Sequence, residues 1–332
     1  MDRQSSNADI SVSAIIAVYN PDLHLFEKAL LSVLIQTYPV SEILLVNDGG
    51  AAQFKDLLPD DSRIKVFSKK NEGVAAARNY AIARCTSDYI AFLDQDDYWY
   101  SDKLQEQIAL IPVFGEHCMV TSPIHIIDFN GDEIQSKSKR TQKIYYLKAS
   151  TEKALLHLAY ENFIYSSTPL IHRCVFEKTG LFDPQAKPHD DWDMYLRIIQ
   201  AGFPVYFYCK KPLSIWRMHD SNESHKANAM LQSKSFVEKK MLGCVADPEV
   251  RKVLLINLQL DNVELDNVLY NEHQYIKFRS LIFPHLRNLF KEYFGNRGAN
   301  KLLDNVLMAR ICKVFLKSVR RYWLSFYYQM RQ

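Results

Sequence analysis

The sequence lacks the patterns that mark several classes of protein. Its six cysteines form no Cys-x-x-Cys pair, which argues against a zinc ribbon and a thioredoxin-like site. It holds no uninterrupted apolar run of about 18 residues, which argues against a membrane-spanning helix. Its polar start, MDRQSSNADI, lacks the apolar region of a secretory signal. A net charge of +3 over 332 residues gives no reason to expect a nucleic-acid partner. We therefore expect a globular protein located in the cytoplasm.

The first 110 residues contain a regular alternation of strand and helix patterns. Segment 11–20 is β-branched and apolar without a break, as in a strand that is buried on both faces. Segment 24–38 carries apolar residues at helical spacing. Because short links join such segments, the alternation predicts a doubly wound, Rossmann-like sheet. Further strands are expected at 42–48, 63–69 and 89–94, and a further helix at 72–85.

Polar residues follow three of these strands. Asn20, Asp48 and Asp94 each stand at the carboxyl end of a predicted strand. In a doubly wound sheet, ligands bind beyond those ends. The three side chains are therefore expected to lie around one binding site.

The rest of the chain shows a different organisation. Residues 124–135, IHIIDFNGDEIQ, predict a β-hairpin that turns at Asn130-Gly131. Residues 190–202 have a helix pattern with an acidic first turn, and residues 204–219 predict a pair of strands. Strand patterns then fade. The expected division is an α/β domain at 1–222 and a helical C-terminal region at 223–332.

Acidic side chains gather in the loop after segment 89–94. Asp94, Asp96 and Asp97 offer oxygen ligands of the kind that Mg²⁺ and Mn²⁺ prefer. Helix N-caps and surface loops also use such triplets, with Asp97 as a candidate cap. The loop by itself leaves both interpretations open.

Three more features have two interpretations each. Arg78 suits a bidentate contact with a phosphate, or it extends from a closely packed helix. The acids of Asp190-Asp191-Trp192-Asp193 favour a helix N-terminus, or one of them is a general base. His219 is a metal ligand or a loop histidine.

The order of these motifs resembles one family. SAIIAVYN, SVLIQTYPVSEILLVNDGG, NEGVAAARNYAI, YIAFLDQDDYW, TGLFDP, DDWDMYLR and WRMHDSNES succeed one another as in family 2 glycosyltransferases with a GT-A fold. The resemblance runs from residue 12 to about residue 225. It implies an α/β fold with a doubly wound mixed sheet, here with a C-terminal helical extension, and an enzyme of the bacterial cell-surface polysaccharide type.

The resemblance implies how a nucleotide-sugar donor is bound. Asp48 matches the acid that binds the nucleotide base, and Arg78 matches the arginine near the base and the diphosphate. Asp94 is the first acid of the D-x-D motif and is expected near the ribose. The other expected donor-binding residues lie in the first nucleotide-contacting loop and beside Asp94: Ala17, Tyr19, Asn20 and Gln95.

The resemblance also implies a reaction. Asp96 matches the ligand of Mn²⁺ or Mg²⁺, and His219 matches a histidine that faces the metal or the diphosphate. Asp191 matches the catalytic base of an inverting transfer, in which an acceptor hydroxyl attacks the anomeric carbon as the nucleoside diphosphate leaves. Arg78 or Arg217 is the further cation expected to help stabilise the leaving group, and Asp97 is expected to be structural.

The implied function is transfer of a hexose or N-acetylhexosamine from a nucleotide sugar to a hydroxyl of a saccharide acceptor. By the same analogy the nucleotide is UDP and the acceptor is lipid-linked, as in O-antigen or capsule synthesis. A catalytically weak binding or scaffold subunit is the alternative, against which the joint presence of the four matched acids argues. A sugar nucleotidyltransferase would need a Gly-rich loop after the first strand, which AVYNPDLHLF does not offer.

Three positions depart from the family pattern. Asn47 stands where Asp is frequent, and Gly50 stands where Ser is frequent. Neither change removes a group that the chemistry requires. Asp190 replaces the commoner Glu before the base, which places acceptor selectivity in doubt more than catalysis.

The C-terminal segment 306–332 has the pattern of a basic amphipathic helix. An apolar stripe and a basic stripe suit the anionic inner face of the cell membrane. The same stripes suit packing on the catalytic domain or on another subunit of a homo-oligomer. The pattern does not distinguish lipid from protein.

Overall fold

The computed structural model describes residues 10–111, 117–220, 222 and 226–269, with the backbone alone from 263 onward. The helix predicted at 306–332 lies outside the described residues. The chain divides into two compact units. The first holds the described residues up to Ala154, together with Asn162–Gln185 and Asp190–Asn222; the second holds Leu155–Glu161, Ala186–His189 and the described residues from 226 onward.

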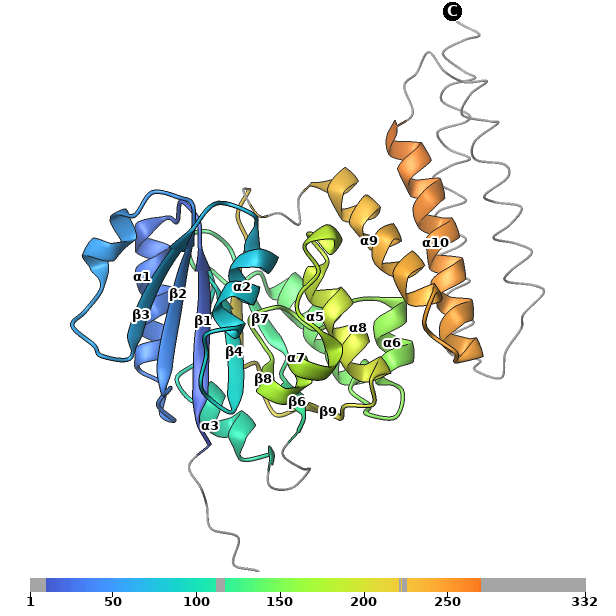
Figure 1. Ribbon diagram of the computed structural model, residues 1–332. Helices are drawn as coiled ribbons and strands as arrows, with labels where there is room; N and C mark the ends of the chain where they lie inside the picture. Colours follow the sequence, from blue (N-terminus) through green and yellow to red (C-terminus); the bar gives the residue numbers. More distant parts are fainter. Residues whose placement is uncertain (1–9, 112–116, 221, 223–225, 270–332) are drawn as a thin grey trace, which may run out of the picture. The chain divides into compact units, whose positions relative to one another are not determined.

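A mixed sheet of seven strands forms the centre of the first unit within the described chain (Figure 1). Its strand order is β3-β2-β1-β4-β8-β6-β9. The first four run parallel, whereas β8 is antiparallel to both β4 and β6. The expected mixed, doubly wound sheet is therefore confirmed. The strands are β1 (Val12–Val18), β2 (Glu42–Asp48), β3 (Ile64–Lys69), β4 (Tyr89–Asp94), β6 (Met119–Thr121), β8 (Leu170–His172) and β9 (Val205–Phe207).

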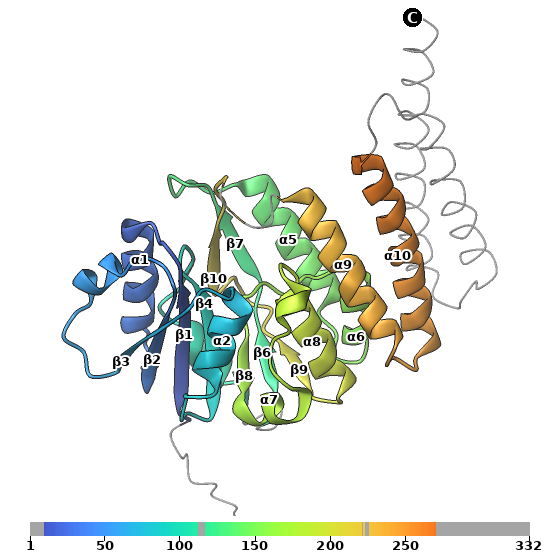
Figure 2. The same cartoon turned by 45° about the horizontal axis from the view of Figure 1, so that its top comes forward.

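Helices cover both faces of the parallel half. α1 (Leu23–Leu34) connects β1 to β2, which is its neighbour in one direction of the strand order. α2 (Val74–Ile82) leads from β3 in the opposite direction to β4, beyond β1. Right-handed crossovers in opposite directions place two helices on opposite faces of a sheet, as the two views show for α1 and α2 (Figures 1 and 2). This explains why β1, β2 and β4 are apolar on both faces and almost wholly buried.

A smaller sheet lies in the same unit. Its order is β5-β10-β7, with strands at Tyr98–Trp99, Ser214–Arg217 and Ile124–Ile127. β10 runs antiparallel to β5 and parallel to β7, so it ties the segment after the acidic loop to residues near 217. The remaining helices of this unit are η1 (Gln53–Leu57), α3 (Lys103–Ile108), α5 (Gln135–Lys148), α7 (Arg173–Thr179) and α8 (Asp190–Gln200).

Two predictions for the middle of the chain are wrong. The turn after β7 does form, but no return strand comes after it: Glu133 makes one isolated bridge to Ile127, and α5 then begins at Gln135. Asp128 Oδ1 accepts hydrogen bonds from the backbone N–H groups of Gly131 and Asp132, which closes the turn locally. The two strands predicted at 204–219 also exist, but they belong to different sheets, because β9 pairs with β6 and β10 with β7.

The second unit is helical in its described part. α9 (Ala227–Leu242) and α10 (Pro248–Leu269) pack against each other, and Lys234 of α9 bridges to Asp261 of α10 at 2.5 Å. Asn257 donates hydrogen bonds to the carbonyl oxygens of Ala159 and Tyr160, at the end of α6 (Ala154–Tyr160). A short 3₁₀ helix, η2 (Pro184–Ala186), precedes α8 in the chain. Among the described residues, every helix is too short or too polar to span a bilayer.

Candidate active site

The carboxyl ends of β1 and β4 meet at the topological switch point of the sheet. The chain leaves β1 towards β2, while β4 lies on the other side of β1. In the parallel register, Ala17 is the partner of Asp94, the last residue of β4. Val18 is the partner of Asn47, which directly precedes Asp48. The predicted gathering of strand-end residues is therefore observed, at the place where α/β folds of this type bind ligands.

The loop after β1 is hydrogen-bonded to the loops after β2 and β4. Asn20 adopts a left-handed backbone (φ 42°), which asparagine tolerates, and its Oδ1 accepts a hydrogen bond from Ala51 N at 2.8 Å. Gln95 bonds both backbone atoms of Tyr19, accepting from its N at 2.8 Å and donating to its O at 3.2 Å. The Tyr19 side chain itself is 48% exposed and is free to meet a ligand.

The two small departures at the end of β2 have local explanations. Asn47 accepts a hydrogen bond from Gly50 N through Oδ1 and donates to Gly50 O through Nδ2, a pairing that an ionised aspartate cannot complete. A Cβ on Gly50 would lie 2.7 Å from the backbone N of Asn20. Both residues therefore allow the loops after β1 and β2 to approach closely.

Asp48 is buried and bound by the segment that enters α2. Its Oδ1 accepts from Lys69 Nζ at 2.9 Å and from Glu72 N at 3.1 Å, and its Oδ2 accepts from Gly73 N at 2.8 Å. The side chain is 3% exposed. The carboxylate thus fixes the loop between β3 and α2 against the end of β2, a contact that its position in the sequence did not indicate.

Arg78 forms ion pairs with two carboxylates of the site. Its guanidinium donates to Asp94 Oδ1 at 2.6 Å and to Asp190 Oδ2 at 3.1 Å. The rings of Phe92 and Phe182 lie 5.9 and 5.5 Å from its Cζ, so the charge is enclosed by aromatic groups. Burial opposes the charge, but Asp94 and Asp190 outweigh it and raise the pKa of Arg78. The resemblance placed this arginine against the donor; the structure shows that it orients Asp94 and joins β4 to α8.

A serine pair before β8 holds the acidic loop. Ser166 donates to Asp94 Oδ2 at 2.5 Å, and Ser167 donates to Asp97 Oδ2 at 2.7 Å. Asp97 also accepts from Arg217 N at 3.0 Å, and it is 3% exposed. Burial, together with Asp96 and Asp94, raises the pKa of Asp97 well above its ordinary value. Sequence reasoning missed both serines, because YSSTP carries no local sign of a partner some 70 residues away.

Arg217 is bound to the turn after β7. Its Nη1 donates to the carbonyl oxygens of Asp128 and Phe129, at 3.2 and 2.8 Å. The residue is 2% exposed. The guanidinium is thus anchored at the turn after β7, and the stabilisation of a departing diphosphate by its charge stays a prediction.

Asp96 and His219 form the second polar pair of the site. His219 Nε2 and Asp96 Oδ2 lie 2.7 Å apart, and both side chains are partly exposed. The hydrogen bond to Asp96 raises the pKa of His219. Asn222 Oδ1 accepts from His219 N at 2.6 Å, which fixes the loop after β10. A carboxylate and an imidazole that face each other at a partly open edge form a donor set that fits Mn²⁺ or Mg²⁺.

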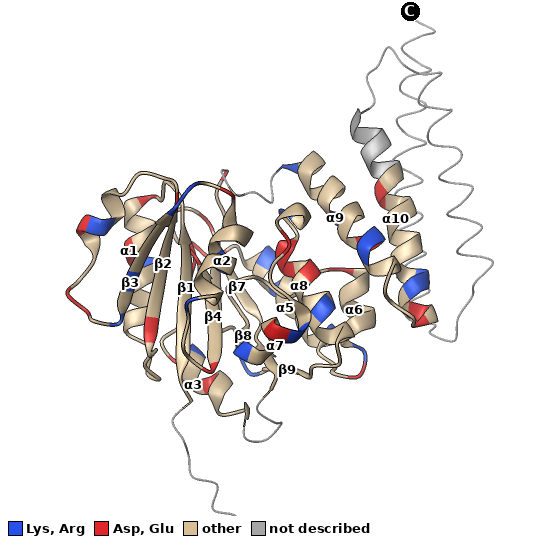
Figure 3. Ribbon diagram, in the orientation of Figure 1, with Lys and Arg blue, Asp and Glu red and all other residues tan. Residues whose placement is uncertain are grey.

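Asp191 lies in the first turn of α8, where acidic positions gather (Figure 3). Its Oδ1 accepts from Trp192 N at 2.6 Å, and Asn162 Nδ2 approaches its Oδ2 at 3.4 Å. Burial and the neighbouring Asp190 raise the pKa of Asp191 from 3.8 to about 7, although Arg78 opposes the change. A carboxylate with such a pKa is suited to accept a proton near neutral pH.

The fold, with acidic residues at its switch point, is that of a class of enzymes, the GT-A glycosyltransferases. The comparisons agree. The family model described as "Glycosyl transferase family 2" matches residues 13–174 of this chain. The chain belongs to this family, as its relatives also show.

Three curated relatives illustrate the kinship. An uncharacterized glycosyltransferase of Rickettsia typhi is 30% identical over 67% of this chain and 68% of its own length. TuaG of Bacillus subtilis, a glycosyltransferase assigned to teichuronic acid biosynthesis, is 39% identical over 59% of this chain and 74% of its own. WfgD of Escherichia coli, a UDP-Glc:alpha-D-GlcNAc-diphosphoundecaprenol beta-1,3-glucosyltransferase, is 36% identical over 42% of this chain and 55% of its own.

Solved structures share the fold at low sequence identity. TarS 1–349 from S. aureus, in complex with UDP-GlcNAc, aligns with a TM-score of 0.60 at 14% identity, covering 97% of this chain and 93% of that one. The mannosyltransferase PcManGT from Pyrobaculum calidifontis, in complex with GDP-Man and Mn²⁺, aligns with a TM-score of 0.57 at 15% identity, covering 95% and 84%. These likenesses confirm the GT-A fold.

Proposed function

We propose that this chain is a metal-dependent, inverting glycosyltransferase that moves a hexose or N-acetylhexosamine from a UDP-sugar to a hydroxyl of a lipid-linked saccharide. One observation carries the proposal above all. Asp191, with a pKa raised to about 7, shares one electrostatic neighbourhood with Arg78 and Asp94 at the switch point of the sheet. This neighbourhood supports assigning Asp191 as the base and Asp94 as the donor-side acid.

The donor side uses the loops after β1, β2 and β4. Tyr19, with its exposed ring, and the adjoining Ala17 and Asn20 contact the nucleotide, while Asp48 lies on the base side. Asp94 takes the ribose side. Arg78 and Ser166 already occupy one oxygen each of its carboxylate, so its orientation is set before any ligand arrives. Gln95 holds the backbone of Tyr19 in register with this acid.

Asp96 and His219 hold the metal, and Mn²⁺ or Mg²⁺ is the ion expected from the oxygen-rich acidic loop. When bound, the ion neutralises charge that develops on the departing diphosphate. Asp97 supports this pair, because its carboxylate accepts hydrogen bonds from Ser167 and from the backbone N of Arg217. These bonds fix the acidic loop against β10. The divalent ion and Asp97 therefore have separate roles.

Asp191 takes the proton of the acceptor hydroxyl as the new bond forms. The hydroxyl oxygen bonds to the anomeric carbon, the bond to the diphosphate oxygen breaks, and the proton passes to the carboxylate. A single displacement of this kind inverts the anomeric centre and needs no covalent nucleophile. The lipid-linked acceptor and UDP are proposed from WfgD, whose name states both a UDP-Glc donor and a diphosphoundecaprenol acceptor.

Activity measurements test the proposal. UDP-Glc, UDP-GlcNAc and GDP-Man are offered in turn with Mn²⁺, Mg²⁺ or a chelator, and release of the nucleoside diphosphate is monitored. We expect Mn²⁺-stimulated turnover with a UDP-sugar and a product of inverted anomeric configuration by NMR. Binding of UDP-sugars without any turnover, on any acceptor tried, would instead support the scaffold alternative.

Two variants refine the test. Asp191→Asn is expected to bind the donor normally and to lose about 100- to 10,000-fold in transfer rate, the range typical of general bases. Asp96→Ala is expected to lose the response to Mn²⁺. Asp60→Asn, an exposed acid of the first unit, serves as the matched control and should behave as wild type. Wild-type transfer by the Asp191 variant would show that the base is another residue.

A further inference from the structure

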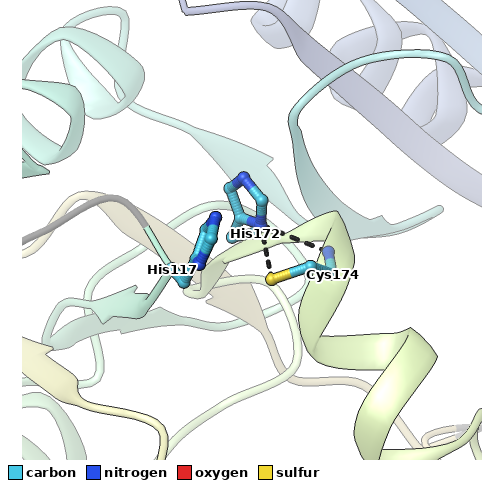
Figure 4. Close-up of side chains that lie close together, drawn as sticks. All are labelled: His117, His172 and Cys174. Carbon is cyan, nitrogen blue, oxygen red and sulfur yellow. Dashed lines mark hydrogen bonds between the residues drawn. The ribbon is translucent and has the colours of Figure 1, made fainter.

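Two histidines and a cysteine lie together near the end of β4 that is opposite the active site. The ligand atoms of His117, His172 and Cys174 all lie within 4.8 Å of one another. His172 Nδ1 lies 2.9 Å from Cys174 Sγ, and the imidazole rings of the two histidines have centroids 4.5 Å apart (Figure 4). We propose that these three side chains form a binding site for a thiophilic divalent cation of the Zn²⁺ type.

The backbone places the three residues together before any ion binds. His172 N donates to Cys118 O at 3.0 Å, which continues the antiparallel pairing of β6 and β8 and brings His117 beside His172. Cys174 N donates to His172 Nδ1 at 3.2 Å, so the His172 side chain caps the start of α7. The ring of Tyr89 packs edge-on against His172 at 5.0 Å. The sheet holds His172 and the start of α7 holds Cys174. The exposed His117 already lies beside His172.

The spacing suits a small tetrahedral ion. Zn²⁺ bonds imidazole nitrogen at about 2.0 Å and thiolate sulfur at about 2.3 Å, so its ligand atoms lie roughly 3.3 to 3.6 Å apart. Movements of about 1 Å convert the present cluster into that arrangement. The ion takes the place of the thiol proton of Cys174, which passes to solvent, and three protein ligands leave the fourth position to water.

The ligand types separate this cluster from the acidic site. Thiolate sulfur favours zinc-like ions, whereas carboxylate oxygen favours Mg²⁺ and Mn²⁺. The cluster and the acidic site also lie near opposite ends of β4. His172 pairs with Tyr89, the first residue of β4, whereas Asp94 is its last residue. Five residues of β-strand span about 17 Å. An ion at the cluster would therefore join residue 117 to the β8–α7 junction without touching the donor site.

Cobalt titration of the full chain, kept reduced, tests the proposal. Co²⁺ replaces Zn²⁺ in thiolate sites and gives a cobalt–thiolate charge-transfer band, which carboxylate sites cannot produce. We expect the band in wild type, its loss on adding Zn²⁺, and no loss on adding Mn²⁺. It should persist in Asp96→Ala, because that variant removes only the acidic site. A wild-type chain without the band, or a band displaced by Mn²⁺, would overturn the proposal.

Matched variants identify the ligands. Cys174→Ser should remove the band, and His117→Gln should weaken Co²⁺ binding at least about tenfold, since even the loss of an outer-shell partner costs that much. Cys209→Ser, Cys244→Ser and His24→Gln change exposed residues outside the cluster and should leave the titration unchanged. A band that survives Cys174→Ser, or that disappears in Cys209→Ser or Cys244→Ser, would place the thiolate elsewhere. Circular dichroism checks that each variant is folded.

Discussion

Replacing Asp191 by asparagine is expected to stabilise the folded chain near neutral pH while it removes transfer activity. Burial, assisted by Asp190, raises the pKa of Asp191 from 3.8 to about 7. Between about pH 4 and pH 7 the folded chain therefore keeps a proton that the unfolded chain has released. Because the folded state binds more protons in this window, the free energy of unfolding falls as the pH rises through it.

The size of the effect is set by the two pKa values. A rise from 3.8 to about 7 corresponds to about 4 kcal/mol of lost stability once the pH exceeds both values. At about pH 5 only about 1.5 kcal/mol of this loss is present. Asparagine carries no charge, so the variant avoids the loss at every pH. The free energy of unfolding of the variant, minus that of wild type, should grow by about 2.5 kcal/mol from about pH 5 to about pH 8.

Urea denaturation at several pH values in this range measures the difference directly. The variant and wild type are unfolded in the same buffers, and Asp60→Asn is unfolded beside them as a control for an exposed acid. The control should track wild type at every pH. A difference between Asp191→Asn and wild type that stays constant with pH would show that Asp191 does not carry the raised pKa, and would remove the main physical reason for naming it the base.

Three other predictions concern the same site. Arg78→Met leaves Asp94 and Asp190 without their buried counter-ion, so the free energy of unfolding should fall by about 3 to 5 kcal/mol in urea denaturation. Gly49→Ala puts a Cβ 2.6 Å from Asn71 N at a φ of 79° and should cost about 1 to 3 kcal/mol, visible as a lower melting temperature. Initial rates of wild-type transfer should rise with pH through about 7 and then level off, because Asp191 accepts a proton only when ionised.

The parallel half of the fold could be predicted because its signals are local. A strand that is covered on both faces is mostly apolar, and the middle residues of β1, β2 and β4 show this. Asn20, Asp48 and Asp94 are then recognised as strand-end residues without any knowledge of the tertiary structure. The short strands β6, β8 and β9 have three residues each, and only their pairing with distant partners defines them.

The misassigned hairpin illustrates the same limit. Asn130-Gly131 does mark a turn, and Gly131 has the positive φ of 100° that such a turn uses. The structure of the segment after the turn depends on a contact with β7: Ser138, on the first turns of α5, exchanges hydrogen bonds with both backbone atoms of Ile126. The serine hydroxyl thus takes the Ile126 N–H that a return strand would have bound, while Ile126 O also accepts from Ile134 N at 3.0 Å. No pattern within the segment predicts that contact.

The replacement of Glu by Asp at position 190 acquires a different meaning from its contacts. Asp190 is buried and paired with Arg78 at 3.1 Å, which binds Asp94 with the other arm of its guanidinium. One cation therefore pairs with two carboxylates, and the charge of Asp190 in turn helps to raise the pKa of Asp191 beside it. In this chain the first acid of the motif directly raises the basicity of the second, whereas Arg78 of α2 opposes that change. Changes at Asp190 should then alter the proton affinity of the base before they alter the choice of acceptor.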